Sequence, residues 1–306
     1  MRLARLYTPQ GGEDYELRGD LAYSRRPGTL SGGRVFDARD LLSPVRPSKV
    51  VAIARNYAEH AKELGHEIPG EPLFFLKPPS SIIGPGAPIR LPPESTEVHH
   101  EAELGLVIGA RATRVSVAAA LGHVLGITCV NDVTARDLQR KDKHFTRSKG
   151  FDSFCPVGPW IETEFTTRPL AIVCRVDGEI RQRGTTADLI FDFATLISHV
   201  SHMMTLEPGD LIATGTPAGV GPIRAGQIVE VQIEGIGTLT NPVVAWEASP
   251  RSEGARSMPS GSPGSRPPTG SPSTQMGGPS GLGWGGPAAL PAWDGPSASP
   301  RRESDE

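Results

Sequence analysis

The chain has 306 residues and a nearly balanced charge, with 31 Lys and Arg residues against 34 Asp and Glu residues. This balance argues against a nucleic-acid-binding protein, and no run approaches a signal peptide or the roughly 18 apolar residues of a membrane span. We therefore expect a cytoplasmic protein that binds neither nucleic acid nor membrane. Cys129, Cys155 and Cys174 form no CxxC pair, so neither a disulfide framework nor a thiolate zinc site is expected.

Composition divides the chain into three predicted parts. Residues 1–46 are expected to form a small N-terminal module, which begins with an apolar–polar alternation. Residues 47–248 are expected to form one large, loop-rich domain. From Ser249 to Glu306, Ser, Gly and Pro supply 34 of 58 residues. Such a segment cannot bury a core, so we predict a disordered tail over residues 249–306.

Short strands with few helices are predicted along the large domain. Apolar runs and alternations predict strands over 49–54, 104–109, 126–131, 171–176, 179–183, 210–214 and 228–233. Helices are predicted over 57–64, 117–125, 134–140 and 191–206. Asp177-Gly178 is the signal of a two-residue hairpin turn. Because strands dominate and the helices come too irregularly for repeated βαβ units, we expect an α+β fold.

Two carboxylates, Glu101 and Glu103, lie two residues apart at the entry to an apolar strand. This spacing puts both on one face, where like charges repel unless a divalent cation lies between them. Asp132 follows the next apolar run, and three such carboxylates suit Mg²⁺ or Mn²⁺. Spacing alone leaves two alternatives open. The two glutamates could form a solvated strand edge paired with Lys or Arg, and Asp132 could cap the helix predicted at 134–140.

His60 and Glu63, three residues apart, share one face of a predicted helix. A carboxylate beside an imidazole fixes its tautomer and raises its basicity, as a water-activating base requires. A pair at this spacing is also common on an exposed helix face. Lys77, Arg136 and Lys149 occur near these acids in the sequence. Arg suits a substrate carboxylate and Lys a developing oxyanion, although each one alone is more typical of a surface cation.

The predicted strand at 210–214 leads into a Gly-rich loop over residues 215–221. This loop lacks the Lys-Ser/Thr ending of a phosphate-binding P-loop and the GxGxxG spacing of a dinucleotide-binding turn. We therefore expect it to bring backbone N–H groups and the Thr216 hydroxyl up to a ligand of another kind.

Six segments, taken in order, resemble the fumarylacetoacetate hydrolase family. They are ARNYAEHAKE (54–63), FLKPPSSI (75–82), HHEAELGLVIG (99–109), NDVTARDLQ (131–139), SKGFDSFCPVGPW (148–160) and PGDLIATGTPAGVGP (208–222). The resemblance covers about residues 48–245. It leaves out the tail, and it matches the first 46 residues only as the variable leading part of many bacterial members. It implies that residues 47–248 form a catalytic domain with a strand-dominated α+β fold, a mixed β-sandwich roll, usually assembled as a homodimer.

The resemblance also implies roles for individual residues. Glu101, Glu103 and Asp132 match the family's metal ligands, with Mg²⁺ or Mn²⁺ as the cofactor. The fourth carboxylate ligand of the larger eukaryotic enzyme is not recognisable, which implies a water in its place. His60 and Glu63 match a catalytic pair that handles water on a mobile lid, and Lys149 matches a catalytic lysine that contacts substrate oxygen. The residues that match substrate contacts are Arg55, Tyr57, Lys77, Arg136, Gln139 and Thr216.

The activity implied by the resemblance is that of an enzyme acting on small 2-oxo acids through a metal-bound enolate. The His60–Glu63 pair favours hydrolysis of a C–C bond in an acylpyruvate-type, fumarylpyruvate-like substrate. The alternative is an isomerase or decarboxylase of the 2-hydroxyhepta-2,4-diene-1,7-dioate type in aromatic-acid catabolism. A more distant alternative is a non-catalytic 2-oxo acid binding protein whose tail recruits partners.

Overall fold

The computed structural model describes residues 1–28, 32–65, 67–142, 144–164 and 166–246. Met1–Ser249 form one compact unit. The tail predicted for residues 249–306 lies outside the described residues, and the predicted division of the chain at residues 46 and 248 stays a prediction. No helix in the described ranges combines the length and the apolar composition needed to cross a membrane.

The largest sheet within the described residues has twelve strands. They are β1 (Arg2–Thr8), β2 (Gly11–Arg18), β3 (Leu21–Ser24), β4 (Arg34–Val35), β5 (Leu41–Leu42), β6 (Val50–Ala54), β7 (Leu73–Lys77), β8 (Ile82–Ile83), β11 (Ala102–Ile108), β12 (Val124–Asn131), β14 (Cys155–Glu162) and β17 (Leu211–Ala213). Their order is β4-β3-β2-β1-β14-β12-β11-β17-β6-β7, with β5 on β1 and β8 on β14. The sheet is mixed, because β6 runs parallel to β17 while β12 runs antiparallel to β11.

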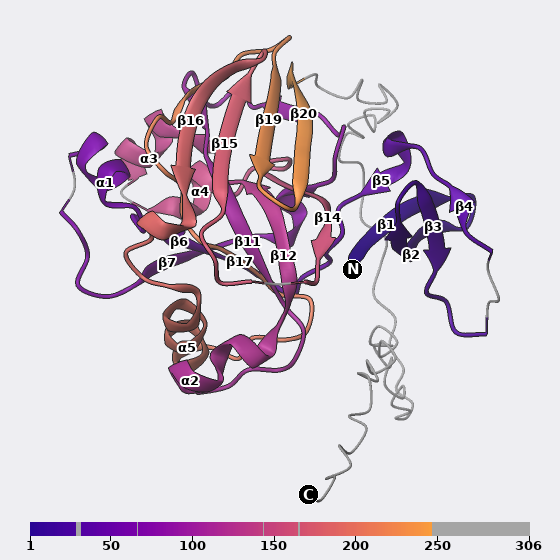
Figure 1. Ribbon diagram of the computed structural model, residues 1–306. Coiled ribbons are helices and arrows are strands. Elements are labelled where there is room, and N and C mark those ends of the chain that lie inside the picture. The colour runs from indigo at the N-terminus through magenta and orange to yellow at the C-terminus, as the bar shows by residue number, and fades with distance from the viewer. Residues whose placement is uncertain (29–31, 66, 143, 165, 247–306) are drawn as a thin grey trace, which may run out of the picture. The chain divides into compact units, whose positions relative to one another are not determined.

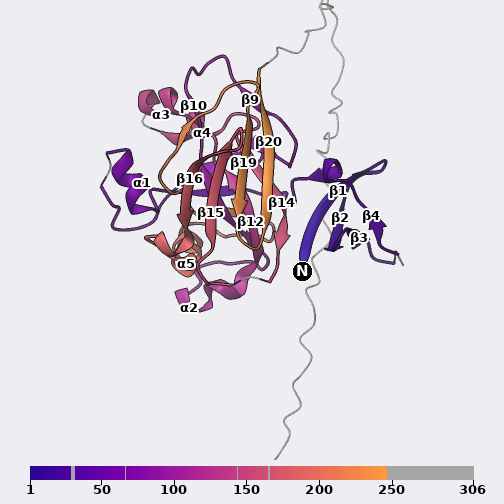
Figure 2. The same cartoon turned by 45° about the horizontal axis from the view of Figure 1, so that its top comes forward.

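A second sheet of five strands covers part of the first (Figures 1 and 2). Its members, in the order β16-β15-β19-β20-β9, are β16 (Glu179–Thr185), β15 (Ala171–Val176), β19 (Ile228–Ile233), β20 (Gly237–Ala245) and β9 (Ile89–Leu91). Leu104 and Leu106 of β11 are buried in the same apolar cluster as Ile172 of β15 and Val231 of β19. The main core therefore lies between the two sheets, and the expected strand-dominated α+β fold is confirmed.

Three short strands and five short helices complete the described architecture. The strands β10 (Val98–His100), β13 (Thr134–Ala135) and β18 (Gly221–Pro222) pair in the order β13-β10-β18. The α-helices are α1 (Ala58–Glu63), α2 (Val117–Ala120), α3 (Arg136–Asp142), α4 (Phe145–Lys149) and α5 (Phe193–Met203). Single 3₁₀ turns occur at Ala38–Asp40, Pro79–Ser81, Leu121–His123 and Thr186–Asp188. Helices α1, α3 and α4 lie on one side of the strands, and α2 lies with α5 at another end (Figure 1).

Two predicted helices differ from the structure. The helix expected over 134–140 begins only at Arg136, because Thr134 and Ala135 pair with β10 as the strand β13. The helix expected over 117–125 ends early, since Val124 and the residue after it already belong to β12. Pairing with neighbours distant in sequence overrides local propensity in both places. The predicted hairpin turn is confirmed: Asp177 and Gly178 have φ of 53° and 81°, and a type I′ turn requires positive values at both positions.

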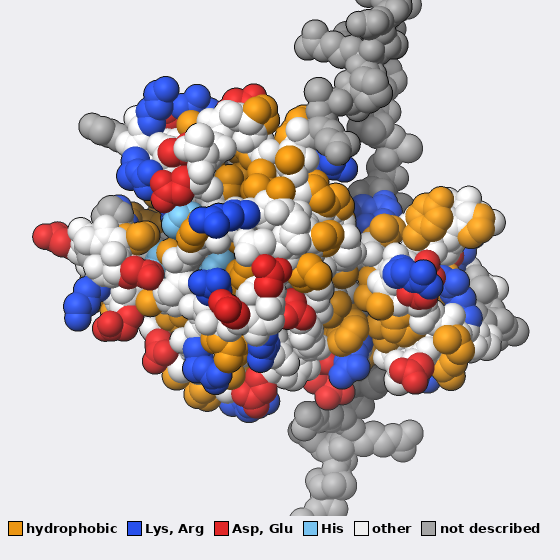
Figure 3. Space-filling view, turned by 90° about the horizontal axis from the view of Figure 1, so that it is seen from above, with side chains coloured by type: hydrophobic (Ala, Val, Ile, Leu, Met, Phe, Trp, Pro, Cys, Tyr) orange, Lys and Arg blue, Asp and Glu red, His pale blue; other side chains and the backbone are white. Residues whose placement is uncertain are grey.

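Charged side chains of both signs are interspersed on the described part of the face drawn in Figure 3. A contiguous basic stripe, which nucleic-acid binding would require, is not evident among the described residues on that face.

Candidate active site

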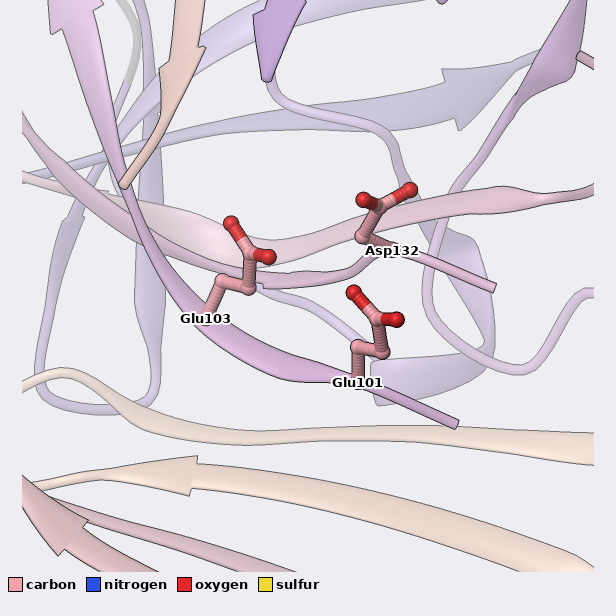
Figure 4. A group of neighbouring side chains, drawn as sticks. All are labelled: Glu101, Glu103 and Asp132. Atoms are coloured by element: carbon pink, nitrogen blue, oxygen red, sulfur yellow. The ribbon is translucent and has the colours of Figure 1, made fainter. Parts of the chain in front are cut away.

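Three carboxylates meet where β11 and β12 lie side by side. Ala102 faces Asn131 in the strand register, so Glu101 and Asp132, just outside it, lie opposite each other. The Asp132 N–H donates to the Glu101 carbonyl at 2.9 Å. Glu103 lies two residues further along, and the three carboxylates point toward one another (Figure 4). One oxygen atom from each lies within 4.8 Å of the others, and all three residues are buried.

Three buried cations face these carboxylates. Lys149, the last residue of α4, reaches Asp132 Oδ2 at 2.5 Å and Glu101 Oε2 at 3.0 Å. Arg136, the first residue of α3, pairs with Glu101 through Nη2. Lys77, at the end of β7, donates to Asp132 Oδ1 at 2.5 Å. Three positive charges therefore balance three negative charges, as the burial of charged groups requires.

The pairing is uneven, so the pKa values of the two glutamates diverge. Burial alone would raise the pKa of Glu101, but the charges of Lys149 and Arg136 hold it below its usual value. Glu103 forms no salt bridge with the described residues. Burial, and then the charges of Asp132 and Glu101, raise the pKa of Glu103 well above its usual value. A divalent cation would remove this repulsion, and carboxylate oxygens are the ligands that Mg²⁺ and Mn²⁺ prefer. The residues present therefore fit the predicted metal.

Helix α1 brings an imidazole to the same place. His60 Nδ1 lies 3.1 Å from Glu63 Oε2, and Glu63 Oε1 accepts the Gly219 N–H at 3.0 Å. One carboxylate therefore orients the imidazole and joins α1 to the loop after β17. His60 is only 5% exposed, in contrast to the alternative of an exposed helix face. Because the contact with Glu63 uses Nδ1, the other ring nitrogen, Nε2, is left for proton transfer.

A cavity of about 330 Å³ joins these groups. Most of the predicted site residues line it, namely Arg55, His60, Glu101, Glu103, Asp132, Arg136, Gln139, Lys149 and Thr216. Its other walls are formed by Ile53, Ala54, Leu64, Phe75, Arg140 and Phe145. The volume lies at the lower end of the range of roughly 300–1,000 Å³ that is usual for ligand pockets. The cavity therefore suits a small ligand.

Two predicted substrate contacts, Lys77 and Tyr57, are not among the residues that line the cavity. Lys77 is fully buried, and its Nζ contacts Asp132 and the Val133 carbonyl, the latter at 3.4 Å. Tyr57 is buried just before α1, where its hydroxyl has no hydrogen-bond partner among the described residues. Burial raises the pKa of the Tyr57 hydroxyl. Substrate binding by these two residues stays a prediction, and the contact that Lys77 makes here is with Asp132.

Arg55 occupies a strained backbone position at the cavity. It follows β6 with a φ of 57°, a left-handed conformation that costs a non-glycine residue energy. The next residue is fixed, because Asn56 Nδ2 donates to the carbonyls of Phe191 and Thr214 at 3.1 and 2.9 Å, and Asn56 Oδ1 accepts the Phe191 N–H at 2.8 Å. Arg55 forms no ion pair with the described residues. The hydrogen bonds of Asn56 thus anchor the backbone beside Arg55, whose guanidinium has no acidic partner within the described ranges.

Several polar residues around the site were missed by sequence reasoning. Asn131 Oδ1 accepts the Glu101 N–H at 3.0 Å, and Thr134 Oγ1 accepts a hydrogen bond from Lys149 at 2.8 Å. Both flank Asp132 in the sequence, so proximity to a candidate ligand was a usable signal. Gln182, on β16, also reaches the site, and no motif or spacing pointed to it.

Comparisons with known proteins agree with this geometry. The family model described as fumarylacetoacetate (FAA) hydrolase C-terminal matches residues 49–244. A mitochondrial oxaloacetate decarboxylase from Dictyostelium discoideum is 48% identical over 197 residues, which cover 62% of this chain and 90% of that protein. The solved 5-carboxymethyl-2-hydroxymuconate delta-isomerase from Mycobacterium smegmatis is 44% identical, with a TM-score of 0.74 over 81% of this chain and 100% of that one. Fumarylacetoacetate hydrolase from Exiguobacterium antarcticum is 36% identical, with a TM-score of 0.71 over 80% of this chain and 100% of that one.

We predict that amide substitutions at the two glutamates change the stability of the metal-free protein in opposite directions. Glu101→Gln removes the carboxylate that pairs with Arg136 and one of the two that pair with Lys149. Breaking a buried pair should lower the free energy of unfolding by about 3 kcal/mol. Glu103 has a raised pKa, so above the usual pKa of Glu the folded state binds more protons than the unfolded state. The free energy of unfolding of the wild type therefore falls as the pH rises from the usual pKa of Glu to the raised pKa of Glu103. Glu103→Gln should remove this loss and gain at least about 1 kcal/mol at pH 8.

Urea unfolding at pH 5 and pH 8 with excess chelator measures both effects. The difference between Glu103→Gln and wild type should grow with pH. Equal losses of stability in the two variants would contradict the uneven pairing of the carboxylates.

Proposed function

This chain belongs to the fumarylacetoacetate hydrolase family, and from that premise we propose that it is a divalent-metal-dependent enzyme acting on small 2-oxo acids. The observation that carries the proposal is the meeting of three buried carboxylates and the His60 imidazole at one small cavity. Glu101, Glu103 and Asp132 would hold Mg²⁺ or Mn²⁺. When bound, the metal supplies Lewis-acid polarisation of the 2-oxo group, which makes the neighbouring carbon more acidic.

The charge of the site favours an anionic substrate. The three carboxylates are already balanced by Lys77, Lys149 and Arg136, so a divalent cation would leave the group with a net positive charge. Arg55, which forms no ion pair within the described part of the chain, adds a further cation at the cavity. A small acid with one or two carboxylates is complementary to this field, and an Arg guanidinium can bind a carboxylate through two parallel hydrogen bonds.

His60 is the group that moves protons in this proposal. The Glu63 carboxylate accepts the hydrogen on Nδ1 and thereby favours the tautomer with a lone pair on Nε2. That nitrogen can take a proton from the carbon beside the 2-oxo group or from a water molecule. Lys149, which keeps its positive charge beside Asp132 and Glu101, stabilises negative charge that develops on a substrate oxygen.

The reaction that we propose is hydrolysis of a C–C bond in an acylpyruvate-type, fumarylpyruvate-like substrate. His60 takes a proton from water, the water oxygen adds to the acyl carbonyl, and the bond between that carbonyl and the pyruvyl carbon breaks. The electron pair of the broken bond goes to the pyruvyl carbon, which receives the proton, so that a carboxylic acid and pyruvate leave. The His60–Glu63 contact supports this choice, because a buried, oriented imidazole suits the activation of water.

A second candidate is decarboxylation or isomerisation, in which no water attacks. The relatives favour it: the proteins named as an oxaloacetate decarboxylase and an isomerase are 48% and 44% identical to this chain, against 36% for the one named as a hydrolase. In this case His60 would only transfer a proton between substrate atoms. We also propose, from family membership, that the protein works as a cytoplasmic homodimer.

A proton-NMR time course with acylpyruvates, unsaturated 2-oxo diacids and oxaloacetate, with Mg²⁺ and then with chelator, tests these candidates. We expect an acylpyruvate to be split into pyruvate and a second acid, and His60→Gln to lower kcat by about 10²- to 10⁴-fold. His202→Gln, at an exposed position of α5, is the matched control and should retain wild-type turnover. A product of unchanged mass, or CO₂ without a second acid, would support the second candidate. Turnover in excess chelator would contradict the metal requirement.

The strained position of Arg55 gives a prediction about substrate charge. Glycine adopts a φ near 57° without steric cost, so Arg55→Gly should change the free energy of unfolding by less than about 1 kcal/mol. KM for fumarylpyruvate, which has two carboxylates, should rise about tenfold, while KM for the monocarboxylate acetylpyruvate should change little. Arg114 has a φ of 51° and does not line the cavity, so Arg114→Gly is the control. Equal changes in both KM values would refute a role of Arg55 in binding the second carboxylate.

A further inference from the structure

Gln182 reaches from β16, an edge strand of the five-stranded sheet, to Ala102, which lies between Glu101 and Glu103, and to Thr216. Its side chain is 1% exposed. The Gln182 Oε1 atom accepts the Ala102 N–H at 3.0 Å, and Nε2 donates to the Pro217 carbonyl at 2.8 Å. A backbone N–H can only donate and a backbone carbonyl can only accept, so these two contacts determine which end of the amide carries the oxygen.

The amide is also fully bonded. His100 Nδ1 lies 2.9 Å from Gln182 Oε1, and since that oxygen only accepts, the hydrogen belongs to the imidazole. The second N–H of the amide goes to Thr216 Oγ1 at 2.7 Å. Both hydrogens and both lone pairs of the amide thus have partners, and a buried group satisfied in this way has one orientation.

The orientation of the Gln182 amide determines where the Thr216 hydroxyl donates its hydrogen and where it can accept one. Because Oγ1 receives a hydrogen from Gln182, its own hydrogen must go to another acceptor, and the Ala102 carbonyl lies 2.9 Å away. One lone pair of Oγ1 then remains. Thr216 lines the cavity, so its hydroxyl can meet a ligand there only as a hydrogen-bond acceptor.

We propose that Gln182 is a positioning residue that holds the Thr216 hydroxyl as an acceptor for an O–H group in the cavity. The identity of the ligand rests on the proposed function. A 2-oxo acid with ionised carboxylates has no polar hydrogen in its keto form, whereas its enol carries a hydroxyl and a water molecule carries two hydrogens. Because the Thr216 hydroxyl can only accept, it would favour binding of the enol over the keto form. Alternatively, it would accept a hydrogen bond from the attacking water and so orient it.

Four variants test this inference with two reactions. The variants are Thr216→Val, Thr216→Ser, Gln182→Met and the double variant Gln182→Met/Thr216→Val. Deuterium exchange into the pyruvate methyl group in D₂O reports enolisation alone, and splitting of an acylpyruvate also reports the attack of water. We expect Thr216→Val to slow at least one reaction about tenfold, and Thr216→Ser, which keeps the hydroxyl, to be faster than Thr216→Val in that reaction. Gln182→Met should reproduce the Thr216→Val pattern, and the double variant should be no slower than Thr216→Val.

Calorimetric titration with Mg²⁺ separates positioning from general damage, since the metal affinity of all four variants should stay within about twofold of wild type. Slowing of both reactions would identify the donor as the enol hydroxyl, and slowing of hydrolysis alone would identify it as water. An active wild type that Thr216→Val leaves unchanged would overturn the inference, and so would additive effects of the two substitutions. A wild type that catalyses neither reaction would refute the proposed function, and with it the ligand assigned to Thr216.

Discussion

Repulsion among three buried carboxylates is the constraint on which the site depends. Glu101, Glu103 and Asp132 are buried at one end of two paired strands, with oxygen atoms within 4.8 Å of one another. Like charges this close stay ionised only if cations compensate them. Lys149 and Arg136 come from short helices on the same side of the sheet, and they bond two of the three acids. Glu103 has no cationic partner among the described residues, so a divalent metal would offset the repulsion most strongly at Glu103.

Hydrogen bonds from the surrounding elements position His60 and Thr216 beside the three carboxylates. Glu63 bonds both His60 and the loop after β17, so the position of the His60 imidazole depends on where that loop lies. The same loop carries Thr216, whose hydroxyl is set by Gln182 from the opposite sheet. Glu63 thus joins α1 to the loop after β17, and Gln182 joins the same loop to both sheets. This arrangement brings residues that are far apart in the sequence to one cavity, as the proposed binding and deprotonation of a small acid requires.

Much of this arrangement could be predicted from the sequence, and the predictions that failed did so for physical reasons. The spacing of Glu101 and Glu103 placed them on one face because a strand alternates its side chains. Glu101 lies opposite Asp132, as the strand register requires. Local propensity failed at Thr134, where pairing with β10 replaces the expected helix. Gln182 carried no signal, because its role arises from tertiary contacts with Ala102 and Pro217. The sequence predicts Lys77 as a substrate contact, but only the fold shows that its ammonium group bonds Asp132.

Titration of the 306-residue chain with Mn²⁺, followed by electron paramagnetic resonance of the free ion, tests the central claim most directly. If the three carboxylates form a metal site, the wild type should bind one ion per chain, and Asp132→Asn should weaken that binding by at least about 100-fold. Substitution of an exposed acid, Glu179→Gln, should leave the binding unchanged. A wild type that takes up no Mn²⁺, or an Asp132→Asn variant that binds it as tightly as wild type, would contradict the account.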